Sequence, residues 1–327
     1  MLTYFGQAIL HAIIAAGVIE ALLRVWRIEP PGARLAFRLL ALALPLIELP
    51  IFAMFASTRS DPWFAEHWAL FSLAEWHELR LSGIGLDVVA LAALALLGLS
   101  LYLLDFLPAL GTWLVDRALP QDDEPAVRSR ISSDIDRISL QLGQKAPLLR
   151  LVRSSMPVLL CAGLTQPRLV VSTGAAAALN NQEMRAALAH ELTHARYRDP
   201  LLGWLLVVMR TIFFFSPASQ IVARAAVEEV ERRADDSAVR LTGDPLGMAG
   251  ALVRLFAAEH TGAGAAPSPD RAIASKVASW LHLGRAAAVE RRCRRLLSPH
   301  AVRPLPYWPL PLFLAGFPLT VLLFFVV

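Results

Sequence analysis

The sequence is poor in charged residues and in cysteine. Charged residues make up 18% of its 327 residues, whereas an ordinary soluble domain carries about a quarter. The two cysteines, Cys161 and Cys293, form no C-x-x-C spacing, which argues against a thiolate metal site and provides no disulfide framework. Basic residues outnumber acidic ones by 31 to 27, but no nucleic-acid-binding motif accompanies them. We therefore expect the basic residues to meet anionic lipid headgroups, and we expect no nucleic-acid partner.

Long apolar runs are abundant, because 56% of the residues are hydrophobic. Runs of about 18 or more mainly apolar residues are typical of membrane spans. Four such runs occur, at Met1–Leu23, Leu35–Ala56, Ile84–Val115 and Tyr307–Val327. The first lacks the basic start of a signal peptide, so we expect a retained anchor. The sequence thus predicts an integral membrane protein with three transmembrane helices in residues 1–116, a soluble domain in 117–305 and a C-terminal transmembrane helix in 306–327.

The charges between the runs predict the orientation of the chain. The loop after the first run carries four arginines against one glutamate, whereas the loop after the second carries more acidic than basic residues. Under the positive-inside rule the first loop is cytoplasmic and the second lies outside. We therefore expect a protein of the bacterial inner (cytoplasmic) membrane with its soluble domain facing the cytoplasm.

Within the soluble domain, hydrophobic periodicity predicts a small sheet beside several helices. Asn180 followed by Glu183 is the signature of a helix N-terminus, and the Gly163–Pro167 stretch predicts the turn of a β-hairpin. The predicted strands are Leu148–Val152, Pro157–Leu164 and Arg168–Ser172. The predicted helices are Ala126–Leu142, Asn180 to the residue before Pro200, Ser219–Leu241, Leu246–Glu259 and Ala286–Leu297. The fold class is therefore α+β and mainly helical.

The stretch "ALAHELTHARYRDP" carries the strongest chemical signal. His190 and His194 are four residues apart, so their side chains project from one face of a helix. Two imidazoles at this spacing can bind one ion, and Glu191 is placed to reach a water on that ion. This HExxH arrangement is typical of zinc peptidases in which the glutamate is the general base. A chance match occurs in about one chain of this length in a hundred.

A catalytic zinc of this kind needs a third protein ligand. The stretch "VEEVERRADDSAV" offers Glu228, Glu229 and Glu231, and only Glu231 has an acidic residue four positions on, Asp235. A carboxylate there can accept the second ring N–H of a zinc-bound histidine. The alternative is a solvated, charged helix face. Asp199, five residues after His194, is either a second such orienting group or a plain carboxylate at a helix end.

The segment Leu201–Phe215 is apolar enough to resemble a further span. A single crossing would place His194 and Glu231 on opposite sides of the membrane. Fifteen residues at about 1.5 Å each cannot cross twice. We therefore predict either a helix buried in the domain or one lying partly in the membrane with both ends on the same side.

"HELTHARYRD" followed by "ERRAD" resembles the integral-membrane gluzincin zinc metallopeptidases. These include the CAAX prenyl protease and HtpX type and the related BlaR/MecR type, and the resemblance covers about Val152 to His260. It implies one Zn²⁺ per chain. The ligands that it implies are His190, His194 and Glu231, with Glu191 as the base and Asp235 orienting a ligand.

The function predicted from these residues is zinc-dependent endopeptidase activity in a membrane. Zinc-activated water and Glu191 would hydrolyse peptide bonds of membrane-proximal or cytoplasmic proteins. The substrate would lie extended along an edge strand, with Val158, Leu159, Leu160 and Cys161 as candidates; an ordinary core strand is the equal alternative. The spacing selects no oxyanion-stabilising residue among His260, His282 and Arg285.

Three other functions are compatible with the sequence. The first is a signalling protease that cleaves a cytoplasmic regulator. The second is a catalytically silent membrane scaffold, which the intact Glu191 argues against. The third is a transporter or receptor with structural zinc, which would normally use four protein ligands, and no fourth histidine or cysteine lies nearby.

Overall fold

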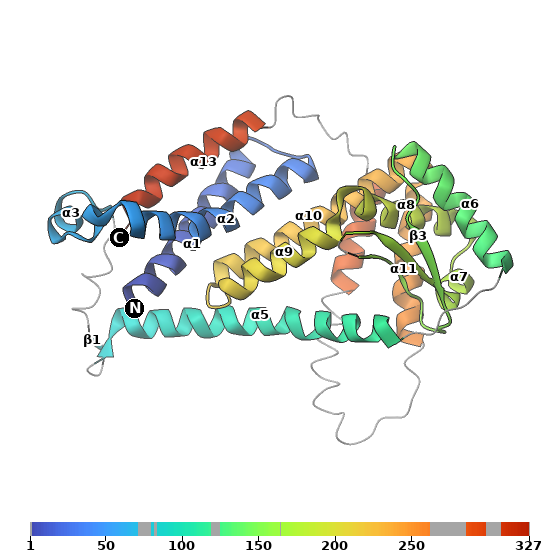
Figure 1. Ribbon diagram of the computed structural model, residues 1–327, viewed down its shortest axis with the longest axis horizontal. Helices are drawn as coiled ribbons and strands as arrows, with labels where there is room; N and C mark the ends of the chain where they lie inside the picture. The colour runs from blue at the N-terminus through green and yellow to red at the C-terminus, as the bar shows by residue number, and fades with distance from the viewer. Residues whose placement is uncertain are drawn as a thin grey trace, which may run out of the picture. The chain divides into compact units, whose positions relative to one another are not determined.

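The computed structural model describes residues 2–70, 80–81, 84–118, 125–163, 165–261, 286–298 and 309–326. The chain divides into two compact units. We call residues 1–113, 204–230 and 302–327 the membrane unit, and residues 114–203 and 231–301 the sheet unit. Figure 1 labels the helices and strands of both units. The division of the sequence into three consecutive domains stays a prediction.

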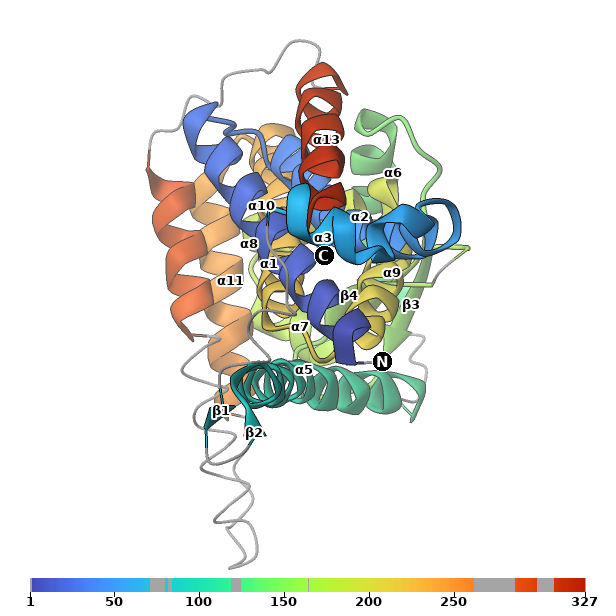
Figure 2. The ribbon, with the colours of Figure 1, turned by 90° about the vertical axis from the view of Figure 1, so that its left-hand side faces the viewer.

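The membrane unit contains the long apolar helices. They are α1 (Leu2–Val25), α2 (Pro31–Phe55), α5 (Leu86–Ala118, of which residues 86–113 belong here) and α13 (Pro309–Phe324). Three of these helices are long and apolar enough in their described residues to cross a membrane, with candidate spans at Phe5–Val25, Pro31–Phe55 and Leu86–Leu104. The fourth predicted run forms α13, which is apolar but only 16 residues long. α1, α2 and α13 pack against one another and lie side by side in Figures 1 and 2.

Short elements link α2 to α5 and were not predicted from the sequence. They are a 3-10 turn (Ser57–Ser60), α3 (Pro62–His67) and the two-residue strands β1 (Arg80–Leu81) and β2 (Ile84–Gly85), which pair antiparallel. Asp61 starts α3 because its carboxylate accepts a hydrogen bond from the backbone N–H of Trp63. Such an N-cap satisfies one of the free donors at a helix start.

A buried charge network joins α1 and α2 to the helix α10 (Pro217–Thr242). The Nε of Arg38 donates to Glu20 at 2.8 Å, and the Nε of Arg34 donates to Glu229 at 2.7 Å. Arg38 also forms an ion pair with Glu229, whose side chain is fully buried. Charges in a membrane-spanning segment are costly unless they are paired. The arginines that predicted a cytoplasmic loop therefore also anchor the first half of α10.

The segment Leu201–Phe215 forms one arm of a helical hairpin. α9 (Asp199–Ile212) and α10 are joined by residues 213–216, and their residues 204–230 belong to the membrane unit. At the tip, the ring of Phe215 packs edge-on against Phe5 of α1 at 5.0 Å. A Cβ on Gly98 of α5 would lie 2.5 Å from the carbonyl carbon of Phe215. The hairpin tip therefore sits tightly against two of the candidate spans.

Replacing Gly98 with alanine is expected to lower the free energy of unfolding by about 1–3 kcal/mol, because an overfilled core must shift its backbone. The matched control is Gly17→Ala in α1, where an added Cβ meets no atom within 4 Å. Thermal unfolding of both variants in detergent measures the difference. Equal stability of the two variants would contradict the contact at Gly98.

The sheet unit has a three-stranded sheet covered by helices. The strands are β3 (Leu148–Val152), β4 (Leu159–Ala162) and β5 (Arg168–Ser172), in the order β3-β5-β4. β3 runs parallel to β5, and β4 pairs antiparallel with β5 as the predicted hairpin. The helices are α6 (Pro125–Gln141), α7 (Thr173–Ala178), α8 (Asn181–Tyr197), α11 (Pro245–Thr261) and the helix of residues 286–297. The α+β, mainly helical class is confirmed.

The core of the sheet unit is formed where α8 packs between α6, α11 and the sheet. Its buried side chains include Ile131, Ile135, Ile138, Leu169, Val171, Leu188, Leu192 and Met248. β4 is shorter than the predicted Pro157–Leu164. Before it, the backbone N–H and C=O of Val158 are bonded to Ser172, and after it Gly163 turns the chain with a positive φ of 98°.

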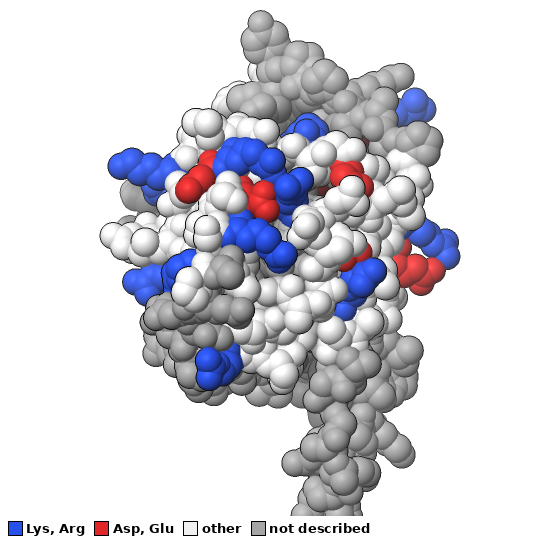
Figure 3. Space-filling model, turned by 90° about the vertical axis from the view of Figure 1, so that its right-hand side faces the viewer, with Lys and Arg blue, Asp and Glu red and all other residues white. Residues whose placement is uncertain are grey.

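Charged side chains of both signs lie next to each other on the face of the sheet unit that Figure 3 shows. On α6, Asp134 forms ion pairs with Arg137 at 2.8 Å and with Arg185 of α8 at 3.2 Å. These pairs are partly exposed, so each contributes little to stability.

Candidate metal centre

The HExxH helix is fixed at both ends by local interactions. At its start, the Asn180 side chain accepts from the backbone N–H of Glu183, and the Glu183 carboxylate accepts from the N–H of Asn180, both at 2.9 Å. This capping box satisfies donors that the first turn leaves free. At its end, Arg198 adopts a left-handed conformation with φ 55°. The chain then turns into α9 at Asp199, as the position of Pro200 predicted.

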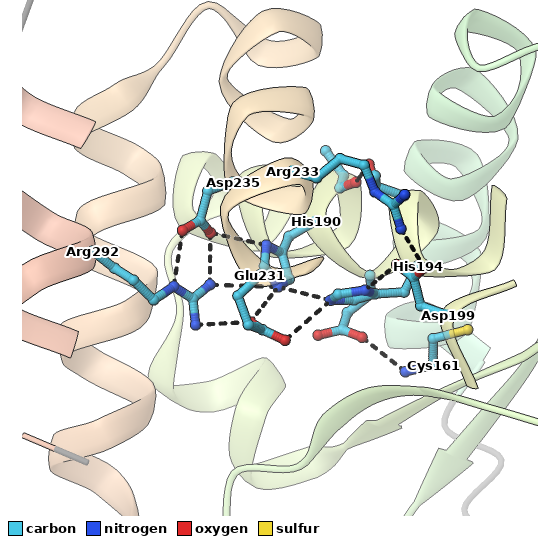
Figure 4. Close-up of polar contacts among 11 residues, drawn as sticks. Cys161, His190, His194, Asp199, Glu231, Arg233, Asp235 and Arg292 are labelled. Carbon is cyan, nitrogen blue, oxygen red and sulfur yellow. Dashed lines mark hydrogen bonds and ion pairs between the residues drawn. The ribbon is translucent and has the colours of Figure 1, made fainter. Parts of the chain in front are cut away.

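His190 and His194 bring their Nε2 atoms to 3.1 Å from each other. Both side chains are largely buried. Glu231 of α10 approaches the same point, with its carboxylate oxygens 3.4 Å from Nε2 of His190 and 3.7 Å from Nε2 of His194. Figure 4 shows the three side chains converging from two helices.

This spacing fits a zinc ion. Zinc binds imidazole nitrogen and carboxylate oxygen at about 2.0–2.2 Å in a tetrahedron, which places its ligand atoms about 3.3 Å apart. The separations among His190, His194 and Glu231 lie on either side of that value. The three residues that were predicted from the sequence as metal ligands therefore lie close together in the fold.

A carboxylate lies behind each histidine. Oδ1 of Asp235 is 3.1 Å from Nδ1 of His190, and Oδ2 of Asp199 is 2.9 Å from Nδ1 of His194. Both carboxylates are almost completely buried. Partners of this kind fix the ring orientation and leave Nε2 for a metal. The position of Asp199 therefore favours the orienting role over a plain helix end, and Arg233 forms an ion pair with it.

The charges of the site shift the pKa values of its members. Burial opposes a charge on His190, but Asp235 and Glu231 outweigh it and raise its pKa to about 10. Burial also opposes the charge of Glu231, yet the pKa of this carboxyl is lowered, mainly by His190. Metal binding by His190 requires its neutral imidazole, so binding and the loss of this proton are coupled.

Glu191 is bonded to the sheet and lies close to both histidines. Its Oε2 accepts a hydrogen bond of 2.8 Å from the backbone N–H of Cys161 in β4. Burial raises the pKa of Glu191, although His194 and His190 act in the opposite direction. A raised pKa suits a carboxylate that both accepts and returns a proton near neutral pH.

Arg292 completes the site and was not predicted from the sequence. Its guanidinium donates to both oxygens of Asp235, at 2.8 and 2.6 Å, and lies 3.0 Å from Oε2 of Glu231. The next turn of the same helix repeats the pattern, because Arg295 donates to Asp236 at 2.7 Å. Burial opposes the charge of Arg292, but Asp235 and Glu231 outweigh it and raise its pKa. The basic helix of residues 286–297 is thus tied to the acidic stretch of α10.

A cavity of about 290 Å³ adjoins these residues. One wall is β4, which contributes Leu159, Leu160 and Cys161, and another is α11. In the described part of the chain β4 pairs only with β5, so its other side faces the cavity. Val158 does not line the cavity. His282 and Arg285 lie outside the described residues, as does the side chain of His260.

The chain is similar to known membrane peptidases. A family model described as "BlaR1 peptidase M56" matches residues 90–244, which include both histidines, Glu191, Glu231 and Asp235. The resemblance to membrane zinc metallopeptidases is confirmed. A "Protease HtpX homolog" of Acidiphilium cryptum is 25% identical over 181 residues, which cover 44% of this chain and 63% of that protein. The "Methicillin resistance mecR1 protein" of Staphylococcus aureus is 28% identical over 79 residues, 24% of this chain and 14% of that protein.

Over part of its length the chain is thus similar to membrane metallopeptidases. The chain spans less than two thirds of the length of the curated relatives that it matches. The stretch that matches the family model, residues 90–244, contains the candidate metal ligands.

Proposed function

We propose that this protein is a membrane-embedded zinc endopeptidase that hydrolyses peptide bonds of membrane-proximal or cytoplasmic proteins. The observation that carries the proposal is the convergence of His190, His194 and Glu231 at the spacing of zinc ligands. Glu191 lies beside them in the position of a base. The charge pattern of the loops supports a sheet unit that faces the cytoplasm, with the inner membrane of a bacterium as the location.

Each residue of the site has a defined task in this proposal. His190, His194 and Glu231 would hold the ion, which supplies a Lewis acid for the peptide carbonyl and acidifies water when bound. Glu191 takes the proton from the attacking water and returns it to the leaving amine. The N–H of Cys161 holds one oxygen of Glu191, which leaves the other oxygen for the proton. Asp235 and Asp199 keep the two imidazoles in place.

The substrate would bind as an added strand beside β4. The side of β4 away from β5 faces the cavity, and an extended peptide can hydrogen-bond to such an edge. Met248, Leu252 and Leu255 of α11 line the cavity on another side. Their apolar side chains favour a substrate with an apolar residue next to the scissile bond.

Metal analysis of the purified full chain in lipid nanodiscs tests the proposal. About one zinc per chain is expected, with hydrolysis of casein or of the chain itself that stops on chelation and returns when zinc is added. Glu231→Gln is expected to weaken zinc binding at least tenfold, whereas Glu228→Gln, three residues earlier on the exposed side of α10, is the matched control. A chain without zinc, or hydrolysis that resists chelation, contradicts the proposal.

A further inference from the structure

An exposed apolar stripe runs along α9. Trp204, Leu205, Val208 and Ile212 follow helical spacing, and each is 46% to 50% exposed. Phe214 at the tip and Ile221 on α10 are also exposed. Large apolar side chains gathered on one face mark a surface that is covered by another apolar phase or partner.

The packed side of α10 includes small residues. Ser219, Ala223 and Ala226 are buried there at 5% exposure or less, beside the larger Val222. Small residues let helices approach closely inside a membrane, whereas large aliphatic residues on the outer face suit lipid chains. The small residues of α10 thus lie on its packed side, whereas the stripe of α9 presents large apolar side chains that suit acyl chains.

The tip of the hairpin satisfies its own backbone polar groups. The fully buried amide of Gln220 donates to the backbone carbonyls of Arg210 and Phe213, at 3.0 and 3.1 Å. Its oxygen accepts from the Nε of Arg210 at 2.8 Å. These carbonyls belong to the C-terminal turn of α9 and its exit, where no helical N–H follows. Such groups must be satisfied within the protein wherever water is absent.

The hairpin also lies along a candidate span. Thr211 is exposed at the end of α9, and its hydroxyl lies 3.0 Å from that of Tyr102 on α5. Arg224 of α10 donates to the backbone carbonyl of Leu101 at 3.0 Å. Both contacts fall within Leu86–Leu104, the candidate span of α5.

We propose that the α9–α10 hairpin is inserted into the hydrocarbon of the bilayer, with the α9 stripe in contact with lipid acyl chains and the Gln220 amide closing its tip. The 14 residues of α9 extend about 21 Å at about 1.5 Å per residue. This is shorter than the hydrocarbon core of about 30 Å, so the hairpin enters and returns on one side. The inference does not depend on the proposed function.

Photo-crosslinking tests the insertion. The full chain carries benzoylphenylalanine at Val208 of the stripe, or at Ser133 on the exposed side of α6 as the control, in nanodiscs of phosphatidylcholine and phosphatidylglycerol. After irradiation, intact-protein mass spectrometry counts lipid adducts and chain–chain products. We expect at least ten times more lipid adduct at Val208 than at Ser133.

Two results would overturn the proposal. Lipid adducts at Val208 no more frequent than at Ser133 would place the stripe outside the hydrocarbon. Chain–chain products as the main outcome at Val208 would make the stripe an interface between copies. The same labelling at Ile221, which is also exposed, controls for a local effect of the label. Either of the two results at Ile221 would likewise contradict the insertion.

Discussion

Replacing Glu191 with glutamine is expected to lower kcat by about 10²–10⁴-fold, the range for removal of a general base, while zinc stays bound. The amide has nearly the shape of the carboxylate, and its oxygen can still accept the hydrogen bond from Cys161. It cannot take a proton from water near neutral pH. Hydrolysis of a quenched fluorescent peptide, with zinc content measured on the same sample, separates loss of the base from loss of the metal.

A matched substitution controls for the effect of removing one acidic group. Glu290→Gln changes an exposed carboxylate that pairs with Arg294 in the helix of residues 286–297, and it should leave kcat within about twofold, as expected of an exposed ion pair. A Glu191→Gln protein that holds zinc and keeps more than a tenth of the wild-type kcat would remove the proposed mechanism. Loss of zinc in the same variant would instead assign Glu191 to the ligand set.

The second large effect is expected for Asp235→Asn, which should weaken zinc binding by about 10–100-fold. Asp235 touches His190 on one side and Arg292 on the other. Without its charge, the imidazole loses the partner that orients it, and the buried guanidinium loses a two-point ion pair. Competition with a chromophoric zinc chelator measures the affinity directly.

Asp236→Asn is the control for the same chemistry one residue later. Asp236 pairs with Arg295 and is partly exposed, so its removal disturbs the same two helices without touching a histidine. Zinc affinity within about threefold of wild type is expected there, since a partly exposed ion pair contributes little. If both variants weaken zinc equally, the contact between the helices and not the orientation of His190 determines the affinity.

Much of the sheet unit could be predicted from the sequence because its determinants are local. The capping pair Asn180 and Glu183 fixes the start of α8, and four-residue spacing fixes the common face of His190 and His194. Glu231 could be distinguished as the candidate metal ligand from Glu228 and Glu229, because only Glu231 is followed by an acidic residue, Asp235, one helical turn later. The structure adds a reason for the difference, since Glu229 is bound to Arg34 and Arg38 in the membrane unit.

The features that were not predicted from the sequence depend on contacts between distant segments. Arg292 lies 57 residues beyond Asp235, inside a run of arginines whose partners no local pattern reveals. The grouping of residues 204–230 with the spans follows from packing at Gly98 and Phe5, which periodicity does not encode. The last apolar run forms a shorter helix than predicted, and its role as a span stays a prediction.

The bond from Cys161 to Glu191 comes from the main chain, so it does not depend on the side chain at position 161. Every amino acid except proline supplies the same N–H, so the residue at position 161 can change without removing the donor that aligns the carboxylate. The Cys161 side chain borders the cavity in which the peptide would lie. Substituting the side chain at position 161 is therefore expected to change the preference for substrates while the backbone N–H continues to align Glu191.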